Sequence, residues 1–180
     1  MTDFTRSDLV IGPDEGEETS TDMVIKARTA QLGGDFSIMH GEVRPNELLA
    51  PHTHHNEDQA VYLLNGSLEF EIGGKGGLRF SAGVGDWVLK PRGVSHGFWN
   101  TGDETVHYIE LSGKDGFERF IDSRAEGIDN LVRTGEQELG MEIHVERIPG
   151  LMLKHKLKGL AGANVPTPRL PKLGGPFGSA

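Results

Sequence analysis

The sequence predicts an all-β protein, built as a barrel or sandwich of short strands. Runs of alternating apolar and polar residues recur at regular spacing, as in 67–72, where Leu68, Phe70 and Ile72 share one face. The 26 glycines and 9 prolines are scattered between such runs, which is typical of a β protein with many turns. A chain of 180 residues is long enough for one domain with a substantial core.

The predicted strands fall in one central part of the chain. A ligand-bearing strand is expected around residues 52–54, and the others at 23–28, 36–43, 60–64, 67–72, 78–81, 87–90, 95–100 and 105–111. The pair Asn65-Gly66 predicts that strand 60–64 runs into a hairpin. We therefore expect an N-terminal arm at 1–22, a β-barrel at 23–112, a helical segment at 113–165 and a Pro/Gly-rich tail at 166–180.

Apolar residues recur at the spacing of a helix from residue 114 onward. Apolar residues recur in two groups, which predict two short helices closing one end of the barrel: Phe117, Phe120 and Ile121, then Ile128, Leu131 and Val132. Residues 136–144 either continue helically or turn at Gly140. The tail contains Pro166, Pro168, Pro171 and Pro176, so regular helix and central strand are excluded there.

Composition excludes several classes of function. The formal net charge of -9 argues against a nucleic-acid partner, because binding phosphates requires a basic surface. There is no cysteine, so any metal must be bound by nitrogen and oxygen atoms. Neither a signal-peptide pattern nor a membrane-spanning apolar run is present, and we expect a soluble cytoplasmic protein.

Potential metal ligands crowd into residues 51–66, PHTHHNEDQAVYLLNG. His52 and His54 are two residues apart, so on a strand both imidazoles project from one face while Thr53 points away. One ion could therefore bind both rings. His55 and Glu57 are alternative ligands only if the register slips by one residue, which would turn His52 and His54 outward.

A second stretch, residues 85–100 (GDWVLKPRGVSHGFWN), supplies a third histidine. The strand at 87–90 stops at Pro91, the Pro-Arg-Gly turn reverses the chain, and His96 follows on a new strand. Buried imidazoles need partners, and an ion bound by all three would provide one.

Both stretches resemble the two sequence motifs of the cupin superfamily. The second motif is complete, with Gly85, Pro91, Gly93, His96 and Asn100. In the first, His52, His54 and Gly66 match, but Gln59 occupies the glutamate position, and Asn46 stands where the longer motif has a glycine. The resemblance covers roughly residues 34–112 and implies a double-stranded β-helix (jelly-roll) barrel.

The resemblance also implies one divalent transition metal, with His52, His54 and His96 as ligands and Gln59 in the fourth position. Imidazole suits Fe, Ni, Mn, Zn and Cu alike, so the identity of the ion stays open. The Gln59 amide neither neutralises one unit of metal charge nor takes up a proton, whereas a glutamate does both. We therefore expect weaker metal binding and a stronger Lewis acid.

Residues that share strand parity with the ligands are expected to line a substrate pocket. These are Val61, Leu63 and Phe98, together with Met39 and His107. An apolar pocket beside a metal predicts an apolar or aromatic small-molecule substrate.

Among cupins, the resemblance is nearest to small single-domain proteins similar to quercetin 2,3-dioxygenase, which implies a metal-dependent dioxygenase. Two alternatives stay open: a Lewis-acid isomerase, cyclase or lyase, and a non-catalytic cupin that binds a small molecule, which Gln59 favours. The N-terminal arm, with Leu9-Val10-Ile11 as an anchor, and the proline-rich tail predict a homodimer.

Overall fold

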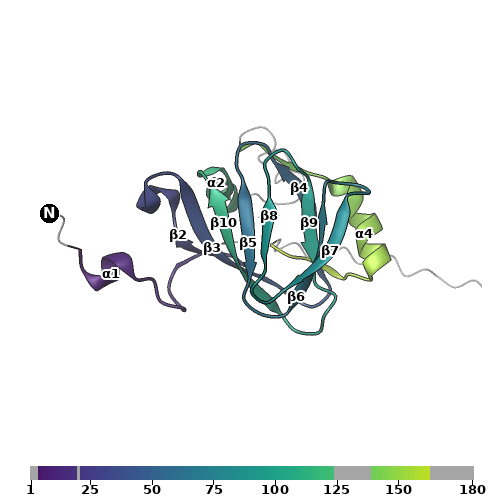
Figure 1. Ribbon diagram of the computed structural model, residues 1–180, viewed down its shortest axis with the longest axis horizontal. Coiled ribbons are helices and arrows are strands. Elements are labelled where there is room, and N and C mark those ends of the chain that lie inside the picture. The colour runs from purple at the N-terminus through teal and green to yellow at the C-terminus, as the bar shows by residue number, and fades with distance from the viewer. Residues whose placement is uncertain (1–3, 20, 124–138, 163–180) are drawn as a thin grey trace, which may run out of the picture.

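The computed structural model describes residues 4–19, 21–123 and 139–162 (Figure 1). Its strands are β1 (Glu17–Glu18), β2 (Val24–Ala27), β3 (Phe36–Val43), β4 (Glu47–His54), β5 (Gln59–Leu63), β6 (Ser67–Ile72), β7 (Leu78–Gly83), β8 (Trp87–Lys90), β9 (His96–Trp99), β10 (Val106–Gly113), β11 (Met141–Ile143) and β12 (Gly159–Leu160). The helices are α1 (Arg6–Leu9), α2 (Gly116–Asp122) and α4 (Ile148–His155), with short 3-10 turns η1 (Thr29–Leu32) and η3 (Val145–Arg147).

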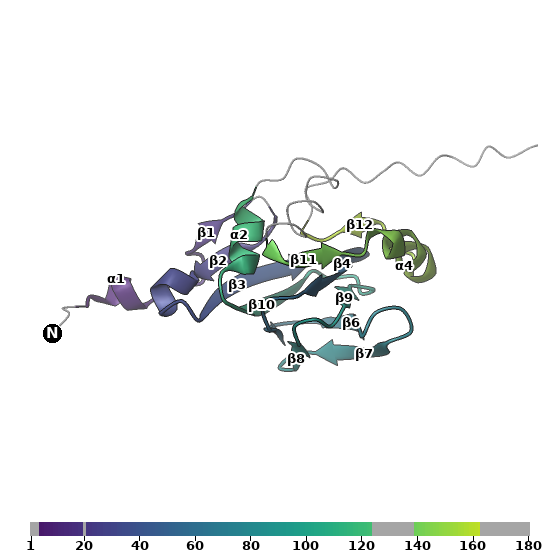
Figure 2. The ribbon, with the colours of Figure 1, turned by 90° about the horizontal axis from the view of Figure 1, so that it is seen from above.

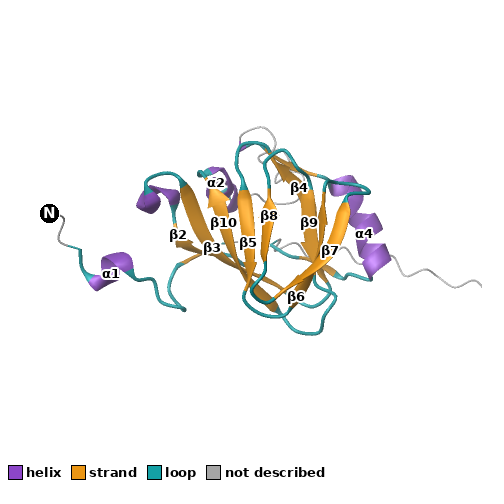
Figure 3. Ribbon diagram, in the orientation of Figure 1, coloured by secondary structure: helices purple, strands orange, loops and turns teal. Residues whose placement is uncertain are grey.

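The strands form two sheets that close into a barrel. Sheet A has the order β1-β2-β3-β10-β5-β8, and sheet B has the order β11-β4-β9-β6-β7, with β12 added parallel to β4. Figure 3 shows the strands at the centre of the molecule and the helices at its periphery. This is the all-β double-stranded β-helix that the sequence predicts. In the described part of the chain, no helix is long and apolar enough to cross a membrane.

The core lies between the inner faces of the two sheets. Alternation along β3 buries Ser37, Met39 and Val43. Phe70 and Phe98 are fully buried and contact each other with ring centroids 5.1 Å apart. Burial of each such side chain stabilises the fold by about 1.5–3 kcal/mol, so packing at this centre fixes the strands that carry the site.

The turn at Asn65-Gly66 does not make the predicted hairpin. β5 belongs to sheet A and β6 to sheet B, so the turn carries the chain from one sheet to the other. The Asn65 side chain holds the turn against the start of β10: its Nδ2 donates to the Thr105 carbonyl at 2.9 Å, and its Oδ1 accepts from the His107 N–H at 2.6 Å. These bonds to β10 take the place of a ladder between the two strands.

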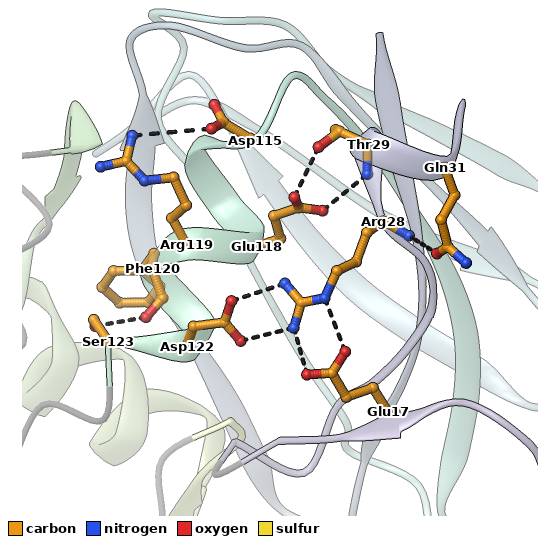
Figure 4. Close-up of polar contacts among 10 residues, drawn as sticks. All are labelled: Glu17, Arg28, Thr29, Gln31, Asp115, Glu118, Arg119, Phe120, Asp122 and Ser123. Carbon is orange, nitrogen blue, oxygen red and sulfur yellow. Dashed lines mark hydrogen bonds and ion pairs between the residues drawn. The ribbon is translucent and has the colours of Figure 1, made fainter. Parts of the chain in front are cut away.

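Helix α2 lies against the barrel, as the first apolar group predicts. Phe120 and Ile121 are buried, and the helix is fastened to the N-terminal strands by polar contacts (Figure 4). The buried Glu118 carboxylate accepts from Thr29 N at 3.1 Å and from Thr29 Oγ1 at 2.7 Å. Arg28, which directly follows β2, pairs with Glu17 of β1 at 2.6 Å and with Asp122 of α2 at 2.8 Å, so it connects these segments.

The later C-terminal segment differs from the helical expectation. Residues 141–143 form β11, which pairs with β4 after a turn in which Gly140 has φ 68°, a left-handed value that favours glycine. Helix α4 lies within the predicted helical segment but outside the two apolar groups that predict individual helices. It has proline in its first turn and buries Ile148 and Leu151. The predicted helix around 128–132 and the tail at 166–180 lie outside the described residues.

Figure 2 shows α2, β11, β12 and α4 along one side of the molecule, opposite β7 and β8. The apolar side chains of α4 pack on Leu48 of β4 and Trp99 of β9. The C-terminal segment therefore covers the outer side of the two strands that carry the histidines.

Candidate metal centre

The three predicted histidines meet on the inner face of sheet B. His52 and His54 lie on β4, and His96, the first residue of β9, is the antiparallel partner of His52. Their candidate ligand atoms all lie within 4.8 Å of one another. The three residues are only 7%, 2% and 1% exposed, so the structure brings together the histidines that the sequence predicts as ligands.

A β-bulge helps to set this geometry. The β4–β9 register shifts between Leu49 and His52, where Pro51 offers no N–H to the ladder. Gly97 lies against this point: a Cβ there would stand 3.2 Å from the Pro51 Cα, tighter than ordinary contact. The Pro51 bulge and the glycine opposite together let β9 approach β4 at the level of the histidines.

Hydrogen bonds fix the tautomers of His52 and His96. The Nδ1 of His52 lies 2.7 Å from the Ala50 carbonyl, and the Nδ1 of His96 lies 3.0 Å from the Val94 carbonyl. A carbonyl oxygen only accepts, so each Nδ1 carries the hydrogen and each neutral ring has its lone pair on Nε2. The two Nε2 atoms are 3.1 Å apart, so two lone pairs face each other across a gap that a cation would bridge.

His54 is oriented by a carboxylate. Its Nδ1 lies 2.8 Å from Glu57 Oε1, and its buried Nε2 has no hydrogen-bond partner among the described residues. Glu57 Oε2 accepts from the Phe117 N–H of α2 at 3.3 Å. Glu57 therefore supports a ligand, as carboxylates commonly do for metal-bound histidines. The sequence predicts Glu57 only as an alternative ligand, although a glutamate three residues after His54 is a signal for this supporting role.

Burial keeps the three rings neutral. Desolvation, reinforced by neighbouring histidines and the charge of Lys90, holds the pKa of His52 and of His96 well below 6.5. Desolvation and the charge of Lys90 lower the pKa of His54 to about 3. Burial raises the pKa of Glu57 to about 7. Metal ligands must be deprotonated, so at neutral pH the site has three imidazole lone pairs to offer.

Gln59 lies on sheet A, whereas the histidines lie on sheet B. It is the first residue of β5 and is 5% exposed. Its Nε2 donates to Ser112 Oγ at 3.1 Å, while its buried Oε1 has no hydrogen-bond partner in the described part of the chain. Three imidazole nitrogens and an unpartnered amide oxygen suit a divalent transition metal. Coordination by Gln59 stays a prediction.

His55 points away from the barrel. Its side chain is 51% exposed, and its Nε2 lies 3.2 Å from Glu142. The slipped register, with His55 and Glu57 as ligands, is therefore not the one that the chain adopts.

A cavity of about 90 Å³ adjoins the cluster through His52. One water molecule needs about 10–15 Å³ of such space, so the cavity can hold a small molecule. Apolar side chains from α2 and β11 form much of its wall, including Phe117, Phe120, Ile121, Met141 and Ile143. Its polar lining consists of five residues: Thr21, His52, Lys90, Tyr108 and Glu110.

The residues predicted to line the pocket do not line this cavity. Val61, Leu63, Phe98 and Met39 are fully buried in the packed core. His107 lies beside His40, with ring centroids 5.2 Å apart, and its neighbour Tyr108 lines the cavity instead. Strand parity correctly placed the first four inside the barrel. The cavity forms where α2 and β11 meet β4. The alternation of side chains within a single strand cannot predict such a contact between elements.

A buried ion pair in the cavity wall was not predicted. Lys90 Nζ lies 2.7 Å from Glu110 Oε1 and 2.8 Å from Oε2, and both residues are at most 2% exposed. Lys90 shares strand parity with the buried Val88, and Glu110 with Tyr108 and Ser112. That parity is the sequence signal that places both charges inside.

The fold is a double-stranded β-helix in which three buried histidines converge and could bind a metal ion. Residues 39–112 match the family described as "Cupin domain". Among curated proteins, none matches the chain.

Solved structures with a similar fold come from several bacteria. A putative sugar phosphate isomerase from Acidithiobacillus ferrooxidans is 20% identical, with a TM-score of 0.48 and coverage of 60% of this chain and 76% of that one. The polyketide cyclase RemF from Streptomyces resistomycificus is 24% identical, with a TM-score of 0.46 and coverage of 63% of this chain and 79% of that one. An uncharacterized Klebsiella pneumoniae protein with a double-stranded beta-helix domain is 20% identical, with a TM-score of 0.46 and coverage of 63% and 90%. At these values, the likeness says nothing of substrate or reaction.

Proposed function

We propose that this chain is a metal-dependent enzyme that acts on a small, largely apolar molecule in the cavity beside His52. The observation that carries the proposal is the facing pair of Nε2 atoms of His52 and His96, 3.1 Å apart, with both Nδ1 atoms held by carbonyls. Such a pair is unfavourable without a cation. The unpartnered Nε2 of His54 adds a third donor.

The first candidate reaction is that of a dioxygenase on an aromatic or enediol substrate. The bound ion would supply a site at which substrate and dioxygen meet. The protein's part is to hold the ion through three imidazoles and to keep water from the reacting molecule with the apolar wall of α2 and β11. Both oxygen atoms would enter the product, so the reaction needs no external reductant.

The second candidate is an isomerase, cyclase or lyase that uses the ion as a Lewis acid. The observation that favours it is Gln59, because an amide leaves the charge of the ion uncompensated where a glutamate would remove one unit. Gln59 cannot accept a proton. The carboxylates of Glu110, in the cavity wall, and Glu57, on His54, are the groups nearby that can.

Dioxygen uptake separates these candidates. Protein reconstituted with Fe, Ni, Mn, Zn or Cu is mixed with a panel of flavonols and enediols, and both dioxygen and substrate are followed. Equal loss of dioxygen and substrate supports the dioxygenase, and substrate conversion under argon supports the Lewis-acid enzyme. Binding without conversion under either condition, with the same affinity in metal-free protein, would refute the proposal in favour of a non-catalytic binding cupin.

We also propose that the chain forms a homodimer. The N-terminal segment extends away from the barrel (Figure 1), and its apolar side chains are exposed: Phe4 by 64%, Leu9 by 66%, Val10 by 42% and Ile11 by 45%. A second copy would bury them. Sedimentation at micromolar concentration should give about twice 19.6 kDa, and a mass near 19.6 kDa would contradict the proposal.

A further inference from the structure

The buried ion pair of Lys90 and Glu110 needs an explanation other than stability. Taking two charges out of water costs several kcal/mol per ion, and buried pairs can often be replaced by apolar residues without loss. Both residues are at most 2% exposed, and both line the cavity that adjoins His52. Charged groups kept in a largely apolar cavity next to a candidate metal-binding cluster indicate recognition of a ligand.

Lys90 has hydrogen-bonding capacity to spare. An ammonium has three N–H donors, and the hydrogen bond and ion-pair contacts of Nζ in the described residues all go to the two oxygens of Glu110. At least one donor is therefore left for another acceptor. The Lys90 ammonium also lies 5.8 Å from the centre of the Phe98 ring, whose face tolerates a cation but does not replace an oxygen acceptor.

The charge balance decides what kind of acceptor fits. Without a metal, Lys90 and Glu110 balance each other. With a divalent ion on the three neutral histidines, the positive charges exceed the one carboxylate in the cavity wall, and Gln59 adds no negative charge. An oxygen anion on the ligand would restore the balance, and charge-assisted hydrogen bonds are the strong ones.

We propose that Lys90, held in place by Glu110, binds an oxygen anion of the ligand, and that the cavity therefore selects small acids with an apolar body. This inference rests on the proposed function for the charge of the ion, and it names the substrate class of the same site. A carboxylate and a phenolate share the required chemistry. Glu110 acts here as a positioning residue.

The test compares benzoate with its neutral isostere benzamide, by NMR titration of metal-free and metal-loaded protein. Signals from cavity residues such as Ile143 and Ala161 should shift with benzoate at concentrations at least about tenfold lower than with benzamide. 4-Nitrophenol gives a second arm, because its absorbance reports its ionisation. Binding should shift it toward the phenolate form if phenolates are accepted as well as carboxylates.

The variant is Lys90→Met with Glu110→Gln, which removes both charges together so that neither is left buried and unpaired. It should keep the wild-type circular dichroism spectrum and lose about tenfold or more in benzoate affinity, with benzamide unchanged. Arg92→Met is the matched control. Arg92 is two residues after Lys90, and its cationic side chain is 52% exposed and paired with Asp58. The Arg92→Met variant should bind benzoate as wild type does.

The outcomes separate this inference from the proposed function when metal content is measured on the same samples. If the protein binds no metal but prefers benzoate through Lys90, the result supports anion recognition and refutes the metal-dependent function. Protein that binds metal but takes benzoate and benzamide equally, or neither of them, would overturn anion recognition alone. A folded double variant with wild-type benzoate affinity would also overturn it.

Discussion

The carboxylate of Glu57 lies 2.8 Å from His54 Nδ1, and this bond joins the cluster to α2 through the Phe117 N–H. Removing such a partner from a metal-bound histidine typically costs about 10–100-fold in metal affinity. We therefore predict that Glu57→Ala weakens metal binding by this factor, measured by competition with a chromophoric chelator.

Glu142→Ala is the control for this change, because Glu142 contacts the exposed His55 rather than a candidate ligand. It should leave metal affinity unchanged. Equal losses in the two variants would show that Glu57 does not act through His54.

Gln59→Glu should strengthen metal binding. A carboxylate beside a cation gains electrostatic stabilisation that an amide does not, and it places a proton acceptor in the site. The measurement is the metal dissociation constant of the variant against that of wild type. An unchanged or weaker affinity would mean that residue 59 does not contact the ion.

Glu71 should fasten the C-terminal segment to the barrel in a pH-dependent way. It is 2% exposed and accepts hydrogen bonds from Arg79 Nε, at 2.6 Å, and from Arg147. Burial alone would raise the pKa of Glu71, but the bonds from Arg147 and Arg79 outweigh it, so the pKa is lowered from 4.5. We predict that Glu71→Gln lowers the free energy of unfolding at pH 7 by about 2 kcal/mol.

The sign of the pH dependence follows from the lowered pKa. The unfolded chain takes up the proton first, so the stabilisation by Glu71 is fully present above pH 4.5 and is lost as the pH falls through the folded-state pKa. Urea unfolding at several pH values should show wild type and variant converging in acid. Glu69→Gln, on the same strand, is the control. A difference that persists unchanged to low pH would contradict this role.

Local sequence patterns predicted those features of the site that are set within a single strand, such as the face on which a side chain lies. The two-residue spacing of His52 and His54 fixes their common face, and the Pro-Arg-Gly turn places His96 on the next strand of the motif. The same parity indicates that Lys90 and Glu110 point inward, although their charge makes that position unexpected without a structure. Two-residue periodicity also predicted most of the barrel strands.

Contacts between distant segments could not be predicted from the sequence. The cavity wall needs α2 and β11 placed on β4, and β11 has only three residues, too few for a periodic signal. The prediction of a hairpin at Asn65-Gly66 was wrong because a hairpin and a crossing between sheets use the same turn residues. What distinguishes them is the bond from the Asn65 side chain to Thr105, forty residues along the chain.

The most direct test of the metal centre is the metal content of wild type, His96→Ala and His55→Ala, measured by elemental analysis after identical reconstitution, together with their melting temperatures. His96 is 1% exposed and within 4.8 Å of the other two candidate ligands, whereas the His55 side chain is 51% exposed on the outer face. We predict about one metal per chain in wild type and in His55→Ala, with a melting temperature that falls on addition of a chelator, because an ion that binds only the folded state stabilises it. His96→Ala should hold little metal and show no such response. Equal metal content in both variants, or a wild-type melting temperature that a chelator leaves unmoved, would contradict the three-histidine site.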